Sequence, residues 1–188
     1  MPVTPFHLGP GSIIKSLFRE KFSLTLFGFS QGVIDIQPVI AITTGIGEAH
    51  GITHSYLGAT IVAIVAAIIG KPLCEYLLRW WNKKLSKTSP AILFFPENIS
   101  WPIAISSAFL GTYSHVLLDS FMHYDMQPFY PAAIKNNLLE IVTITELHLL
   151  CSAAAVLGFV LYFGCGYWLM KNKGKTETSL RNDSTRIG

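Results

Sequence analysis

The sequence predicts an all-α fold, an integral membrane helical bundle with about four transmembrane helices and a short N-terminal amphipathic helix. Of the 188 residues, 51% are hydrophobic and 13% are charged, whereas a soluble domain usually carries about 25% charged residues. The mean hydropathy is positive, at +0.44. A helix of about 20 apolar residues crosses the hydrocarbon core of a bilayer. Four segments meet this length: residues 22–46, 56–79, 99–122 and 147–170.

The segment before the first span is expected to form the amphipathic helix. Prolines and glycines disfavour helix up to Gly11. From Ser12 to Lys21, apolar residues recur at helical spacing, and Lys15 and Arg19 fall between them. One face of this helix would therefore meet lipid or protein, and the other would meet lipid head groups.

Asp35 is the one charged residue of the first predicted span. An ionisable group inside a membrane indicates a functional site. Gln37 and Pro38 follow directly, and the proline predicts that the helix kinks or breaks there. A carboxyl group kept neutral or hydrogen-bonded within the bundle is the alternative interpretation.

Two histidines lie four residues apart before the second predicted span, in the polar connection 47–55. If His50 and His54 belong to the first turn of the next helix, both imidazoles project to one side. Further along that span, alternating charges also recur every four residues, which favours ion pairs on a solvated or head-group face. These charged residues are Lys71, Glu75 and Arg79.

The end of the third predicted span carries His115, Asp119 and His123 at intervals of four residues. At about 3.6 residues per turn, these positions share one helix face. Burying two imidazoles and a carboxylate without partners costs several kcal/mol. A cation satisfies all three groups at once, so the spacing predicts a metal-binding face.

The distribution of lysine and arginine predicts the topology. The N-terminal segment, the 80–98 loop and the C-terminal tail hold nearly all of these cations, which places both termini in the cytoplasm. The two histidine-containing motifs then lie at the same face of the membrane, the one away from the cytoplasm. His7 would start at the other face, so either the N-terminal segment folds into the bundle or His7 is not a ligand.

The chain is expected to form one membrane-embedded metal-site domain over residues 1–170, followed by a disordered basic tail over 171–188. The connection 123–146 is long enough to be functional. Whether Glu146 and His148 join the site stays open at this point.

The candidate ligands are imidazoles and carboxylates, which favour zinc, with manganese or iron(II) as alternatives. The three cysteines show no metal-binding spacing and are expected to be small buried hydrophobic residues. The candidates outnumber the ligands of one tetrahedral ion, so two or more ions sharing carboxylates are plausible. Such a site activates water toward a phosphodiester or ester.

Three motifs, MPVTPFHLGPG at the N-terminus, HGITHS (50–55) and GTYSHVLLD (111–119), resemble the bacterial integral-membrane family of membrane-bound metal-dependent hydrolases. The resemblance covers roughly residues 1–131. The HxxxD element is more remotely similar to the zinc-dependent phospholipase C and single-strand nuclease superfamily. The resemblance implies metal ligands at His7, Asp35, His50, His54, His115 and Asp119.

The sequence departs from the family pattern at two places. Gln37 stands where the family often has the second aspartate of a D-x-D pair, and Gly51 replaces an arginine. His123 and Asp125 replace more neutral positions. We expect this last pair to be catalytic, orienting or protonating the leaving group.

The expected function is metal-dependent hydrolysis of a phosphoester or ester, including lipid-derived ones, at the bacterial inner membrane. Membrane lipids are the expected partners, and a net charge of +3 is too small to indicate nucleic acid. One alternative is metal handling or transport, for which four spans are few unless a homo-oligomer supplies more. The other is a non-catalytic scaffold whose histidines are hydrogen-bonded within the bundle.

Overall fold

Every regular element in the described part of the chain is a helix, so the predicted all-α fold is confirmed. The computed structural model describes the backbone of residues 5–184 and the side chains of residues 6–168. The α-helices are α1 (Leu8–Phe18), α2 (Leu24–Ile34), α3 (Ile36–Thr44), α4 (Tyr56–Lys84), α5 (Trp101–Met122) and α6 (Ile144–Ser184). Short 3₁₀ turns are η1 (Pro5–His7), η2 (Arg19–Lys21), η3 (Ile52–His54) and η4 (Ala91–Leu93).

The first predicted span breaks at Asp35, as the sequence indicates. α2 ends before this residue and α3 begins after it. Pro38 has no N–H to donate to the carbonyl of Ile34, so the hydrogen-bond ladder cannot run unbroken through this point. Proline is tolerated in the first turn of α3, because the first N–H groups of a helix lack intrahelical partners anyway. The break leaves Asp35 inside the protein at a helix junction.

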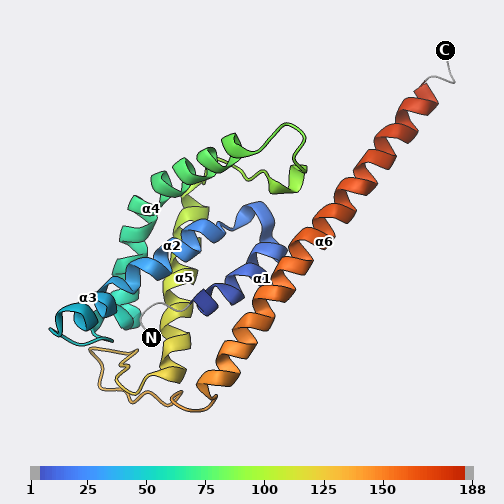
Figure 1. Ribbon diagram of the computed structural model, residues 1–188. Helices are drawn as coiled ribbons and strands as arrows, with labels where there is room; N and C mark the ends of the chain where they lie inside the picture. Colours follow the sequence, from blue (N-terminus) through green and yellow to red (C-terminus); the bar gives the residue numbers. More distant parts are fainter. Residues whose placement is uncertain (1–4, 185–188) are drawn as a thin grey trace.

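Helices α2, α4 and α5 form the central bundle (Figure 1). Their contact surfaces are built from small residues, which allow helix backbones to approach closely in a membrane. α4 contributes alanines at helical spacing, and α5 contributes alanines and Gly111 from its facing side. The buried small residues are Ala59, Ala63, Ala66, Ala67, Ala104, Ala108 and Gly111.

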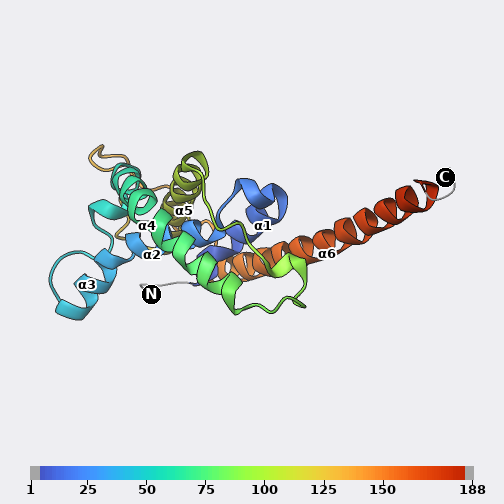
Figure 2. The same cartoon turned by 90° about the horizontal axis from the view of Figure 1, so that it is seen from above.

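Helix α6 packs along α1 and extends well beyond the bundle (Figures 1 and 2). The crossing is close because glycine lies at two contact points. A Cβ atom on Gly9 would overlap the Cys151 carbonyl, and one on Gly158 would overlap Ser12. This packing brings α1 and the turn before it into the bundle, which decides the open question about the N-terminal segment.

Three helical segments in the described residues are long and apolar enough to cross a membrane, where the sequence predicts about four. They are Leu24–Thr44, Tyr56–Lys84 and Ile144–Trp168. α5 is long enough, since 22 residues rise about 33 Å at about 1.5 Å each. Its serine, threonine, histidine and aspartate side chains lower its hydropathy. Many of these polar groups are buried in the bundle: Ser107, Thr112, His115, Asp119 and Ser120.

The outward faces of the helices carry large apolar side chains that no other part of the protein covers. On α4, Ile61 and Ile68 are 59% and 56% exposed, and on α6, Leu149 and Val156 are 69% and 65% exposed. An apolar surface of this extent is unfavourable in water. It is the surface expected of helices that meet lipid.

Helix α6 continues into the segment that the sequence predicts as a basic tail. The backbone is helical to Ser184, and residues 185–188 lie outside the described part. A polar segment that continues an existing helix avoids the cost of nucleation, since each added residue adds a hydrogen bond.

Two of the three charged residues on α4, Lys71 and Glu75, pair as expected. Lys71 Nζ lies 2.7 Å from Glu75 Oε1. Glu75 also accepts a hydrogen bond from the backbone N–H of Ile99, at 2.8 Å. The pair therefore attaches α4 to the segment that leads into α5.

Candidate metal centre

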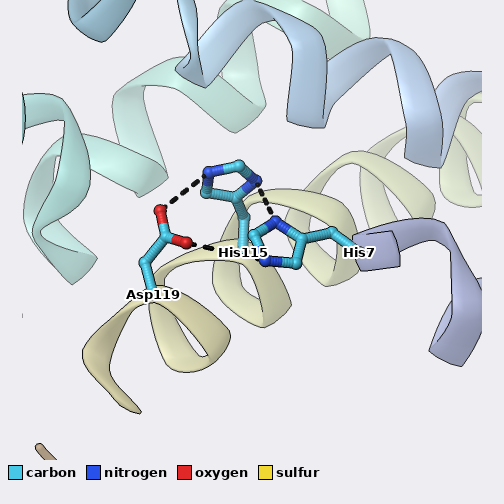
Figure 3. Close-up of side chains that lie close together, drawn as sticks. All are labelled: His7, His115 and Asp119. Atoms are coloured by element: carbon cyan, nitrogen blue, oxygen red, sulfur yellow. Dashed lines mark hydrogen bonds and ion pairs between the residues drawn. The ribbon is translucent and has the colours of Figure 1, made fainter. Parts of the chain in front are cut away.

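Five ionisable side chains from separate parts of the chain meet in one buried group, termed the inner cluster. His7 ends η1, Asp35 lies between α2 and α3, His54 ends η3, and His115 and Asp119 lie on α5. None of the five is more than 6% exposed. Figure 3 shows how His7 and Asp119 lie on either side of His115. The structure therefore brings together five of the six ligands that the family resemblance implies.

Local features of the fold place each of these groups. The helical repeat of α5 stacks His115 one turn before Asp119. The 3₁₀ turn η3 lies directly against the start of α4, where a Cβ atom on Gly58 would overlap the Ile52 carbonyl. This close packing of η3 against α4 fixes the position of His54 beside the other members of the inner cluster.

Four atoms of the inner cluster lie close to one another. His115 Nε2 lies 3.2 Å from Asp35 Oδ1 and 3.1 Å from Asp119 Oδ2. His54 Nε2 lies 3.9 Å from Asp35 Oδ1 and 3.7 Å from Asp119 Oδ2. Donor atoms 2.0–2.1 Å from a tetrahedral zinc ion are about 3.3 Å apart. The distances from His115 Nε2 match this spacing, those from His54 Nε2 are longer, and Asp35, His54 and His115 together form a group that could hold an ion.

Neighbouring hydrogen bonds determine which nitrogen of His54 carries the proton. The Thr53 hydroxyl donates to Gln37 Oε1 and lies 3.1 Å from His54 Nδ1. Since its proton is committed to Gln37, the hydroxyl accepts from an N–H at Nδ1 of His54. Nε2 of His54 is then the unprotonated nitrogen, and its lone pair faces Asp35 and Asp119.

His7 contacts the opposite side of the His115 ring. The Nδ1 atoms of the two rings are 3.3 Å apart, and His7 Nε2 lies 3.6 Å from Asp119 Oδ1. If Nε2 of His115 binds an ion, its proton sits on Nδ1 and is donated to His7. Groups that hold the far nitrogen of a ligand histidine orient the ring and raise its basicity. His7 is thus placed to support His115 and, through its own Nε2, to reach the second oxygen of Asp119.

Three ring nitrogens of the inner cluster lack hydrogen-bond partners among the described residues. The Nε2 atoms of His7, His54 and His115 are all buried and have no hydrogen-bond partner in the described structure. Buried polar atoms without partners are rare and costly. His54 Nε2 and the two carboxylates are all acceptors, so hydrogen bonds among themselves cannot satisfy them. A cation can, and the buried histidine and aspartate groups are suited to hold a metal ion.

The electrostatics of the two loop histidines agree with this role. Burial lowers the pKa of His54 to about 3 and that of His7 to about 4, although Asp119 opposes both shifts. Both imidazoles are therefore neutral at physiological pH. The neutral ring is the form that binds a metal ion.

A second group, termed the outer group, lies beside the inner cluster and is partly exposed. His50 Nδ1 is 2.9 Å from both carboxylate oxygens of Asp125. The rings of His50 and His123 stack with centroids 4.1 Å apart, and His50 meets His54 edge-on at 5.2 Å. These three residues can also hold an ion.

Two expectations about these histidines are wrong in detail. His123 does not continue the His115/Asp119 helix face, because α5 ends at Met122 and His123 is extended. His50 and His54 do not share a helical turn, because residues 49–55 form turns before α4. His50 accordingly faces Asp125 and not the inner cluster. Spacing by four residues predicts a shared face only where the backbone is helical.

Glu146 and His148, left open by the sequence, lie outside both groups. Glu146 accepts hydrogen bonds from the backbone and hydroxyl of Thr143 at the start of α6. His148 stacks on Phe6 with ring centroids 4.6 Å apart. Both residues therefore have structural partners of their own.

Comparison of the sequence with models of protein families shows which family the chain belongs to. The profile of the YdjM inner membrane protein family matches residues 13–177. The chain belongs to the YdjM inner membrane protein family. No curated protein and no solved structure shows significant similarity to the chain. Together with the three apolar helices, this membership confirms the expected inner membrane localisation.

Sequence reasoning missed the residues that hold the ligands in place. Gln37 and Thr53 form the hydrogen-bonded chain that ends at His54. Gln31 donates to the backbone carbonyl of His7, at 3.2 Å. Gln37 was noted in the sequence as a missing carboxylate, whereas the structure shows it organising a ligand. Polar residues next to candidate ligands in apolar segments are the signal that points to such roles.

Proposed function

We propose that this protein is a membrane-embedded metal-dependent hydrolase that acts on a phosphoester or ester drawn from membrane lipids. One observation carries the proposal. The unprotonated Nε2 of His54 is buried without a hydrogen-bond partner and faces the carboxylate oxygens of Asp35 and Asp119, so all of these atoms are acceptors. This set of acceptors lies buried in an inner membrane protein. A divalent ion there supplies a Lewis acid for polarising a phosphoryl or carbonyl oxygen and for activating water.

Zinc fits the inner cluster best, with manganese and iron(II) as alternatives. The donor atoms are imidazole nitrogens and carboxylate oxygens, and the spacing suits a four-coordinate ion. Asp119 presents one oxygen to His54 and His115 and the other to His7.

The outer group is the proposed proton-transfer device. Asp125 accepts from Nδ1 of His50, which fixes the tautomer and leaves Nε2 as a base. Burial and the neighbouring His50 lower the pKa of His123, which favours the neutral ring that can accept a proton. Partial burial opposes ionisation of Asp125, but the hydrogen bond from His50 lowers its pKa below the usual range. Asp125 thus stays charged and orients His50 while His50 and His123 exchange protons with the leaving group.

The proposed topology is multi-pass, with α5 as the fourth span and both termini in the cytoplasm. α5 packs against α2 and α4 along its length, and its polar side chains face the bundle, so its low hydropathy does not oppose a membrane position. The excess of lysine and arginine at one end of the bundle supports this orientation. Under this topology, the outer group opens toward the periplasmic face.

Metal-dependent turnover tests the proposal. Purified protein loaded with zinc or manganese is assayed on bis-p-nitrophenyl phosphate, on p-nitrophenyl esters and on phospholipid mixed micelles. We expect turnover that chelation abolishes and metal restores. Asp119→Asn should lower the rate about 100-fold or more, because even the groups that orient a metal ligand contribute 10–100-fold.

Glu97→Gln is the matched control. It makes the same carboxyl-to-amide change on an exposed residue before the start of α5, at the other end of that helix from the cluster. This variant should retain full activity. Stoichiometric metal without turnover on any of these substrates would contradict the hydrolase proposal, and zinc flux in proteoliposomes would then favour metal transport.

A further inference from the structure

A large cavity lies apart from both histidine groups. It has a volume of about 740 Å³ and is bounded by α1, α2, α4, α6, the segment before α5 and the first turn of α5. This volume falls within the roughly 300–1,000 Å³ typical of small-molecule sites. None of the residues of the inner cluster or the outer group lines it. Its occupant therefore need not be the molecule that reaches the metal.

The wall of the cavity is overwhelmingly apolar. Leucine, isoleucine and aromatic side chains from four helices line it, among them Leu24, Leu78, Ile103, Phe159 and Phe163. Such a wall offers a long hydrocarbon chain the same environment as the lipid core and few hydrogen bonds to any polar ligand. The apolar wall of the cavity therefore favours an acyl chain as its occupant.

One cation and one carboxylate line the cavity, and two further cations lie over aromatic rings that line it; these four charged residues are termed the rim. Lys15 lines the cavity, Arg19 lies over the ring of Tyr162 at 5.5 Å, and Lys84 lies over the ring of Trp80 at 5.7 Å. Glu20 is the one carboxylate among the lining residues. Tryptophan and tyrosine are typical of the level of the lipid head groups, so the charges lie where a head group would lie.

Lys15 retains a donor for such a group. Its ammonium donates to the carbonyls of Arg19, at 2.7 Å, and Phe22, at 2.9 Å. A lysine has three N–H donors, so one stays free of these two carbonyls. A phosphate or other anion at the rim would complete its hydrogen bonds.

We propose that this cavity binds an anionic membrane phospholipid, with its acyl chain among α2, α4 and α6 and its phosphate at the rim beside Lys15, Arg19 and Lys84. The apolar interior and the net positive rim complement the two parts of such a lipid. The site is independent of metal binding, since it shares no residue with the inner cluster.

Quenching of tryptophan fluorescence by brominated lipid tests this site, because Trp80 and Trp81 line the cavity. The full chain carries Trp101→Phe and Trp168→Phe, so that these two residues alone report. The detergent-solubilised protein is titrated with phosphatidylglycerol that carries bromine on one acyl chain. We expect saturable quenching, with phosphatidylcholine of the same chain binding at least threefold more weakly.

Two variants on α6 provide the matched comparison. Ala155→Phe fills the cavity, whereas Ala153→Phe makes the same change on an exposed position that does not line it. The saturable phase should disappear in Ala155→Phe and persist in Ala153→Phe, with both proteins retaining wild-type helicity. Arg19→Gln/Lys84→Gln should reduce the preference for phosphatidylglycerol.

Three results would overturn the proposal. Quenching that rises without saturation in all variants means that lipid meets only the outer surface. Saturable quenching that survives Ala155→Phe places the lipid elsewhere. Equal affinity for the two head groups removes the role of the basic rim.

Discussion

Replacing His115 and Asp119 together, as His115→Gln/Asp119→Asn, is expected to abolish metal binding by the purified protein. These side chains supply two of the four donor atoms and contact every other member of the inner cluster. Groups that only orient a ligand contribute 10–100-fold to metal affinity, so loss of two ligands should weaken binding by more than about 100-fold. Elemental analysis of protein purified from zinc- and manganese-supplemented cells measures the change.

The outer group provides the comparison for this loss. His123→Gln/Asp125→Asn makes the same pair of substitutions at partly exposed positions. This variant should keep the ion of the inner cluster and lose at most a second, weaker ion. Equal metal content in the wild type and in His115→Gln/Asp119→Asn would show that the buried cluster is not the binding site.

Adding one methyl group at Gly111 is expected to destabilise the bundle strongly. A Cβ atom there would overlap Ser30 Oγ and lie 2.6 Å from the backbone oxygen of Phe27. The side chain of Ser30 can rotate, but the backbone of α2 must move. Overpacking of this kind costs about 1–3 kcal/mol, and a protein of this size loses roughly 2–4 °C in Tm per kcal/mol. Gly111→Ala should therefore lower Tm by about 5 °C.

The same displacement should weaken metal binding, because α2 leads to Asp35 and α5 carries His115, whose side chains are 3.2 Å apart. Gly32→Ala is the control. Gly32 also lies in α2, but a Cβ atom there meets nothing within 4 Å, and alanine is the better helix former. Thermal scans should show Gly32→Ala at or above the wild-type Tm. A similar loss in both variants would mean that the α2–α5 contact is not as close as described.

Much of this fold follows from elementary sequence signals. The apolar lengths predict the long helices, Pro38 predicts the break at Asp35, and the spacing of His115 and Asp119 predicts their stacking on α5. Each of these signals depends only on residues that are close together in the sequence, so it can be interpreted without the tertiary structure.

The tertiary arrangement of the ligands could not be obtained in this way. His7 reaches the cluster because glycines let α1 and α6 cross closely, and only the family resemblance, not the residue pattern around His7, indicates that contact. His50 and His54 share a motif but face different groups, because the backbone between them is not a helix. The role of Gln37 depends on Thr53, 16 residues away.

X-ray absorption at the zinc edge of the zinc-loaded protein tests the metal centre most directly. The inner cluster predicts a first shell of nitrogen and oxygen at about 2.0–2.2 Å, with the outer-shell scattering of imidazole rings and no sulfur. The imidazole signal should diminish in His54→Gln, which removes one ligand and leaves Asp35 and Asp119 in place. A sulfur shell at about 2.3 Å, or a spectrum unchanged in His54→Gln, would contradict the assignment of the ion to this cluster.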